Sequence, residues 1–231
     1  RIERPTKKWN TEKCSIFLFL AKINYKKKMK KYLFIIVSII FSSCASVYIT
    51  KEGQAKADKH QSIAILAPKV GFKQAKRIEA EALKEAQRTS ALEIQQEMYK
   101  WMLKRKSQGR VTIDIQDVEE TSVLLNRNGY TGNNLTTNEI CEILDVDALL
   151  YSNFNLAQPT SQGAAIAVAA LFGVGMRTNQ ASAALNIKDC ESKGMIWNYD
   201  HEFSGGLGSS SQDLVENLMR NASKKLPYYK K

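Results

Sequence analysis

Histidine and proline are scarce in this chain of 231 residues, which contains two histidines and four prolines. His60 lies in a polar stretch and His201 in an aromatic strand pattern. Neither has partners at metal-ligand spacing, so both are expected to be structural or surface residues. The sequence also lacks a Walker loop, a G-x-S-x-G elbow and a nucleotide-binding glycine turn before a suitable helix. We therefore predict a protein that is not an enzyme and that binds no metal, cofactor or small-molecule substrate.

Long hydrophobic runs are absent as well, since a membrane-spanning helix needs about 20 apolar residues. The ten residues 32–41 (Y-L-F-I-I-V-S-I-I-F) are too few, but they follow Lys30 and Lys31 and precede two serines. A short basic region, an apolar region and small residues are typical of a secretory signal peptide. Residues 29–43 are predicted to be that signal.

The formal net charge of +11 suggests a nucleic-acid binder, but the charge is concentrated near the N-terminus. Residues 1–28 carry a net +7 and residues 29–43 add +2, which leaves only +2 for residues 44–231. No nucleic-acid partner is therefore expected. Residues 1–28 precede a better start at Met29, and we interpret them as an upstream, non-native extension.

The signal ends in F-S-S-C at residues 41–44, which resembles a bacterial lipobox. In that pattern Cys44 becomes the N-terminus and carries lipid, and several acyl chains suffice for stable membrane anchoring. The alternatives are an ordinary cleaved signal, or an uncleaved anchor with a chance cysteine. We predict lipidation at Cys44, followed by a polar tether at residues 44–61 that holds the domain away from the membrane.

Apolar periodicity predicts a single α/β (α+β) domain over residues 62–231, with a mixed sheet of about five strands and flanking helices. Asp117 with Glu120, and Thr136 with Glu139, are predicted helix N-caps. Alternation from Met195 to Phe203 places Trp197 on the buried face of a hairpin strand. The expected strands are 62–68, 111–115, 147–156, 181–188 and 195–203, and the expected helices are 74–106, 117–129, 136–144 and 210–226.

An uncharged segment at residues 163–176 (G-A-A-I-A-V-A-A-L-F-G-V-G-M) interrupts this pattern between two strands. It is too short to span a membrane as a helix. We favour a buried or partner-covered helical insertion, and the alternative is a loop that contacts a membrane or a second copy of the chain. In that alternative the contact residues are Ile166, Val168, Leu171 and Phe172.

Two cysteines, Cys141 and Cys190, follow Cys44 in the chain. An oxidising compartment would permit a disulfide, but one residue falls in a predicted helix and the other in a hairpin turn. We expect one buried thiol and one partly exposed thiol, with a disulfide as the less favoured alternative.

Three motifs resemble those of a known group of envelope lipoproteins. They are I-A-I-L-A-P at 63–68, I-C-E-I-L-D-V-D-A-L-L-Y at 140–151, and A-L-N-I-K-D-C-E-S-K-G-M-I-W at 184–197. The group comprises curli-secretion-channel-like lipoproteins, penicillin-binding-protein activator lipoproteins and the N-terminal domain of the Tol translocation protein. The resemblance covers roughly residues 62–226 and implies their fold. The long alternating insertions of the pore-forming members have no counterpart here.

These features favour a non-catalytic lipoprotein anchored in the outer membrane and facing the periplasm. It would act as an adaptor or assembly component of the cell envelope, with an envelope protein or a second copy as its partner. One alternative is a subunit of an oligomeric secretion complex of the curli-channel type. The other is a periplasmic enzyme, but the sequence contains no recognisable set of catalytic residues.

Overall fold

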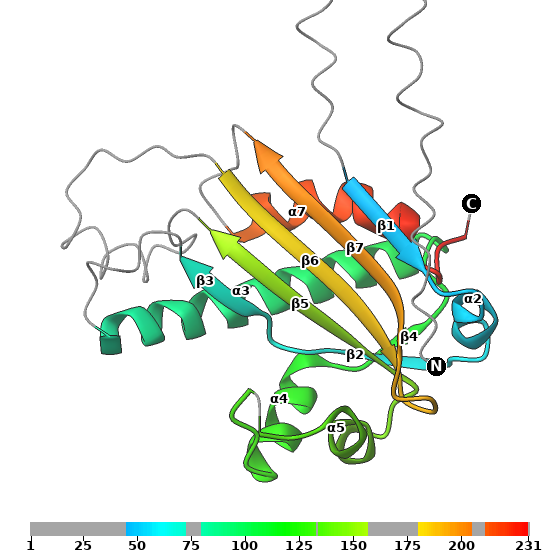
Figure 1. Ribbon diagram of the computed structural model, residues 1–231, viewed down its shortest axis with the longest axis horizontal. Coiled ribbons are helices and arrows are strands. Elements are labelled where there is room, and N and C mark those ends of the chain that lie inside the picture. The colour runs from blue at the N-terminus through cyan, green and yellow to red at the C-terminus, as the bar shows by residue number, and fades with distance from the viewer. Residues whose placement is uncertain (1–44, 73–79, 133, 157–179, 205–210, 231) are drawn as a thin grey trace, which may run out of the picture. The chain divides into compact units, whose positions relative to one another are not determined.

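Seven strands form one mixed sheet, with helices packed against both of its faces (Figure 1). The structure is a computed structural model that describes residues 45–72, 80–132, 134–156, 180–204 and 211–230, all within one domain. The strands are β1 (Ala45–Ile49), β2 (Ser62–Ile65), β3 (Lys69–Phe72), β4 (Asp114–Ile115), β5 (Ala148–Leu156), β6 (Gln180–Asp189) and β7 (Met195–Ser204). The helices are α2 (Gly53–Ala57), α3 (Ala80–Ser107), α4 (Val118–Arg127), α5 (Thr137–Leu144), α7 (Ser211–Ala222) and the 3₁₀ turn η4 (Ser223–Lys225).

Strand β5 has partners along both edges. One edge runs antiparallel to β6, while the other pairs in parallel with β2 along its first half and with β3 along its second half. Pro68, which has no N–H to donate, lies in the break between β2 and β3. The strand order is β1-β7-β6-β5-β2-β4, with β3 alongside β5.

Helices α3 and α7 cover one face of the sheet and lie side by side behind it in Figure 1. The apolar side chains of alternate strand residues meet them there, including Ile65, Leu150 and Leu185. On the other face, α4 and α5 pack against β2 and β5 through a smaller cluster around Leu66 and Leu149. Within the described ranges, no helix is long and apolar enough to cross a membrane.

Both predicted helix caps are present. The Asp117 carboxylate accepts hydrogen bonds from the backbone N–H groups of Glu119 and Glu120 at the start of α4. Thr136 and Glu139 form a reciprocal capping box at the start of α5. These caps satisfy N–H groups that have no partner inside the helix, so they fix where each helix begins.

The sheet has seven strands rather than about five, and the polar tether is wrong over most of its length. Residues 45–49 form strand β1, which pairs antiparallel with β7, and residues 53–57 form helix α2. Strand β3 is the other addition. Both are short strands in which apolar and polar residues alternate over too few positions to be distinctive.

The expected hairpin is confirmed as β6 and β7, with one difference at its closed end. A register irregularity between Ile187 and Lys188 places Ile196 inside the core and leaves Met195 exposed. An extra residue in a strand shifts the residues beyond it to the other face. The expected strand at 111–115 is reduced to Asp114–Ile115, preceded by an isolated bridge between Val111 and Tyr229.

Trp197 is fully buried beneath the helices, as expected from its alternation. Its ring stacks against that of Tyr199 at a centroid distance of 6.0 Å, and its Nε1–H donates to the carbonyl oxygen of Lys225 at 2.8 Å. The side chain therefore fills core volume and also ties η4 to the sheet.

We expect Trp197→Ala to lower the free energy of unfolding by about 3–5 kcal/mol, because it leaves a large cavity. It also removes the hydrogen-bond donor of the Lys225 carbonyl. Trp101→Ala is the matched control, since that ring is only partly buried on α3 and lies under Arg105. Its loss should be close to 1 kcal/mol. Urea unfolding of both variants checks the difference, and equal losses would contradict the buried placement of Trp197.

Candidate functional site

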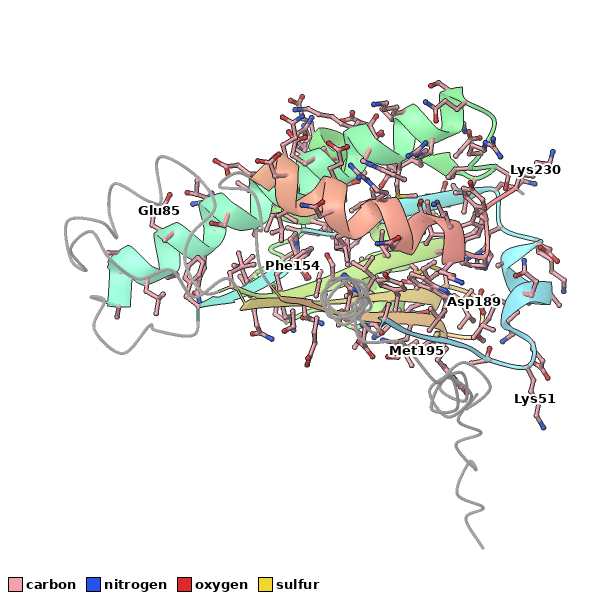
Figure 2. All side chains as sticks on the ribbon, turned by 90° about the horizontal axis from the view of Figure 1, so that it is seen from above. Lys51, Glu85, Phe154, Asp189, Met195 and Lys230 are labelled. Atoms are coloured by element: carbon pink, nitrogen blue, oxygen red, sulfur yellow. A yellow bond between two sulfur atoms is a disulfide. The ribbon has the colours of Figure 1, made fainter. Side chains whose placement is uncertain are left out.

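A partly buried polar cluster joins three separate parts of the chain at the closed end of the β6–β7 hairpin. We call it the His60 cluster, and it consists of Lys56, His60, Asp189, Ser192 and Tyr228. His60 Nδ1 lies 2.7 Å from the Tyr228 hydroxyl, and His60 Nε2 lies 3.0 Å from Asp189 Oδ1. Figure 2 labels Asp189 at the end of the domain that also carries Lys51 and Lys230.

The carboxylate of Asp189 holds the cluster together although its residue is only 2% exposed. Burial alone would raise its pKa, but hydrogen bonds from the Ser192 side chain and backbone and from His60 lower the pKa to about 2. Lys56 Nζ lies 3.6 Å from Asp189 Oδ2 and adds a positive charge beside it. The carboxylate is therefore ionised at neutral pH and can only accept hydrogen bonds.

The ionised carboxylate sets the direction of the hydrogen bonds around a neutral His60 ring. Because Asp189 accepts, Nε2 of a neutral His60 carries the proton and Nδ1 is left to accept from the Tyr228 hydroxyl. Burial, with the nearby carboxylates Asp189 and Asp147, raises the pKa of Tyr228, so that hydroxyl stays protonated and can donate. Both ring nitrogens of His60 are hydrogen-bonded, and the His60 side chain and Tyr228 are only 5% and 4% exposed, so the pair is shielded from solvent.

The cluster therefore acts as a structural latch. His60 immediately precedes β2 and follows α2, so its contacts hold the β1–α2 segment against the hairpin turn and the C-terminal segment. A second carboxylate reinforces this connection, because Asp147 Oδ2 accepts from the backbone N–H groups of Gln61 and Ser62 at 2.8 and 3.0 Å. Burial raises the pKa of Asp147, but these hydrogen bonds outweigh it and lower the pKa.

Cys141 and Cys190 form a disulfide, so the expectation of two free thiols is wrong. Their Cα atoms are 5.8 Å apart, within the range a disulfide can join. The Cys190 N–H donates to the Asp147 carbonyl oxygen, which draws the hairpin turn towards the end of α5. The sequence alone does not indicate that this helix and this turn are in contact, because they are far apart in the chain. The pairing of β5 with β6 brings them together.

Cys44 and the segment 163–176, with Ile166, Val168, Leu171 and Phe172, lie outside the described residues. Ala45, the residue after Cys44, is the first residue of β1. All five residues of β1 are exposed, and the strand pairs with β7 and with no other described strand. His201 is buried on β7, in keeping with the expected structural role.

The sequence did not point to the His60 cluster or to β1. Within the described ranges, no three His, Cys, Asp or Glu side chains are grouped to hold a metal ion. The signal for the cluster was weak: a lone histidine before an apolar strand, and an aspartate that ends another strand. Only the fold places these two residues 129 positions apart in contact.

No family model and no curated protein matches the chain. Solved structures do match it, although distantly. The C-terminal domain of LpoB from Salmonella enterica is 10% identical, with 63% of this chain and 83% of that chain covered at a TM-score of 0.34. Lipoprotein GNA1162 from Neisseria meningitidis is 12% identical, with 71% and 94% covered at a TM-score of 0.38.

A PelC dodecamer from Paraburkholderia phytofirmans is 7% identical, with 82% of this chain and 100% of that chain covered at a TM-score of 0.35. A lipoprotein is thus among the structural neighbours, as in the group that the three sequence motifs resemble. Identities of 12% or less describe the arrangement of helices and strands alone. The function is therefore argued from the chain's own residues.

We expect Asp189→Asn to lower the free energy of unfolding by about 2 kcal/mol at pH 7. The pKa of Asp189 is about 2 in the folded chain against 3.8 as the ordinary value, so its ionised form favours folding. This contribution is complete above pH 3.8 and is lost as the pH falls through about 2. Urea unfolding of both proteins between pH 7 and the acid range measures it.

Asp145→Asn is the matched control, because Asp145 is exposed and asparagine also tolerates its left-handed conformation. Its stability should change by less than about 0.5 kcal/mol at every pH. A gap between Asp189→Asn and the unmodified protein that stayed constant down to acid pH would contradict the ionised hydrogen-bonded carboxylate.

Proposed function

We propose that the protein is a non-catalytic lipoprotein of the bacterial cell envelope, anchored in the outer membrane through Cys44 and facing the periplasm. The observation that carries the proposal is the junction at Cys44. A basic, apolar and small-residue leader ends at this cysteine, and the next residue, Ala45, pairs with His201 as the first residue of β1. The proposed lipidation site is thus one peptide bond from a residue of the sheet.

The disulfide between Cys141 and Cys190 supports an exported location. Disulfides persist in oxidising compartments such as the bacterial periplasm and are rare in the reducing cytosol. The bridge closes a loop with a sequence separation of 49 residues, so it restricts the unfolded chain considerably. Such a bridge stabilises the domain only where it stays oxidised.

A non-catalytic role is supported by the burial of the His60 cluster. An acid–base catalyst must reach the proton it transfers, and the His60, Tyr228 and Asp189 side chains are almost fully buried. The same contacts are useful in a binding protein, because they make the N-terminal segment part of a rigid body. We therefore propose that the protein acts as an adaptor or assembly component.

The partner contact is proposed to involve segment 163–176, through Ile166, Val168, Leu171 and Phe172. These uncharged side chains are stabilised by about 1.5–3 kcal/mol each when they leave water.

The anchor is tested by mass spectrometry of the protein purified from envelope membranes. We expect an N-terminal, acylated Cys44 and no residue before it. Peptides containing Cys141 and Cys190 should be recovered joined from the same sample. Cys44→Ser should leave the protein unacylated and should release it from the membrane fraction. A mature chain that retains residues before Cys44, or a Cys44→Ser protein that still fractionates with membranes, would overturn the anchor.

The partner contact is tested by replacing residues 163–176 with a short Gly-Ser turn. The domain should stay folded, because β5 and β6 pair antiparallel up to Asn155 and Ser182, and a short turn can join two such strands. Its state of association, measured by light scattering in detergent, should shift towards the monomer, or its yield in pull-downs of envelope proteins should fall. If the variant unfolds, the segment belongs to the core, and the buried-insertion interpretation is the correct one.

A further inference from the structure

We propose that the anchored domain lies directly on the bilayer through the β1 edge, with Val47, Tyr48 and Ile49 in the interfacial zone. This rests on the lipid anchor proposed at Cys44. The first ground is covalent: consecutive Cα atoms are 3.8 Å apart, and Ala45 already belongs to the sheet. No flexible residue separates the lipidated position from the fold. Val47 lies only three residues from the anchor, or about 10 Å along the strand.

The second ground is the chemistry of the strand. Natural edge strands are usually protected by charge, proline or a bulge, and β1 (A-S-V-Y-I) has neither charge nor proline. Val47, Tyr48 and Ile49 are among the exposed large apolar residues of the domain, as is Met195 at the neighbouring start of β7. Tyrosine is a residue favoured at membrane interfaces, where its ring meets lipid and its hydroxyl meets water.

The third ground is the rigidity of the segment. β1 could act as a flexible tether only if it left the sheet. Contacts on β1 itself, and contacts on the residues that follow it, hold it in place. Its pairing with β7 runs from Ala45 to Ile49, and the Thr50 N–H donates to the Ile196 carbonyl oxygen at 3.0 Å. Lys56, within α2, and His60, just after it, both contact Asp189.

The backbone also sets the depth. The outer edge of β1 presents N–H and C=O groups without a described partner, and such groups are too costly to place in hydrocarbon. The strand must therefore stay in the hydrated headgroup region. A second copy could instead pair with the same edge, but only the bilayer is brought there by the anchor itself.

The test is photo-crosslinking of the full protein in its own membranes. Tyr48 is replaced by the photoreactive Tyr48→p-benzoylphenylalanine, and the control carries the same group at Val123. Both positions are exposed, at 53% and 45%, but Val123 is on α4, which packs near β2 at the far side of the sheet. After irradiation we expect phospholipid adducts at position 48 that are several-fold more abundant than those at position 123.

Inserting ten Gly-Ser residues between Cys44 and Ala45 should reduce the adduct at position 48, because the domain is then free to leave the surface. If the amount of adduct at position 48 stays the same, the direct connection between Cys44 and Ala45 is not what holds β1 at the bilayer. Equal lipid adducts at both positions, an adduct to a second copy, or an adduct to another protein at position 48 would overturn the proposal. Acylation of Cys44 is measured in the same sample. If Cys44 is not acylated, the proposed anchor is wrong. If Cys44 is acylated but position 48 forms no lipid adduct, only the placement of β1 on the bilayer is wrong.

Discussion

Strand β5 must satisfy hydrogen bonds on both edges while it buries side chains on both faces, and this requirement organises the domain. Its apolar sequence A-L-L-Y-S-N-F-N-L meets the requirement by facing two different cores. Leu150 and Phe154 point to the large cluster under α3 and α7, whereas Leu149 points to the smaller cluster under α4 and α5. Parallel partners on one edge and an antiparallel partner on the other then result from the connections.

Sequence reasoning succeeded where a local pattern has a direct physical cause. Alternation identified β6 and β7, because their buried side chains on one face had to repeat every second residue. Capping residues located the starts of α4 and α5, since Asp117 and Thr136 bond to N–H groups only a few positions away. Both signals are contained within about ten residues of chain, which is why they can be recognised without the fold.

The features that escaped prediction depend on distant contacts. Strand β1 is held by backbone pairing to β7 and all five of its residues are exposed, so it lacks the buried face that would mark it as a strand in the sequence. The Cys141–Cys190 bridge depends on the pairing of β5 with β6. That register places Asp189, the residue before Cys190, opposite Ala148 at the start of β5, close to the end of the helix that carries Cys141. The His60 cluster likewise joins residues from three segments. None of these pairings leaves a periodic trace in the sequence.

If Cys44 is lipidated as proposed, these long-range contacts limit how far the domain can move from the membrane. A flexible chain of the 18 residues 44–61 would have a root-mean-square reach of about 23 Å from the membrane. With β1 in the sheet and His60 latched to Asp189, that reach falls to the one peptide bond between Cys44 and Ala45. If Cys44 carries lipid as proposed, the domain would stay at the membrane surface. Its partner would then have to present a surface at the membrane, and β1 would be the edge of the sheet that faces the lipid.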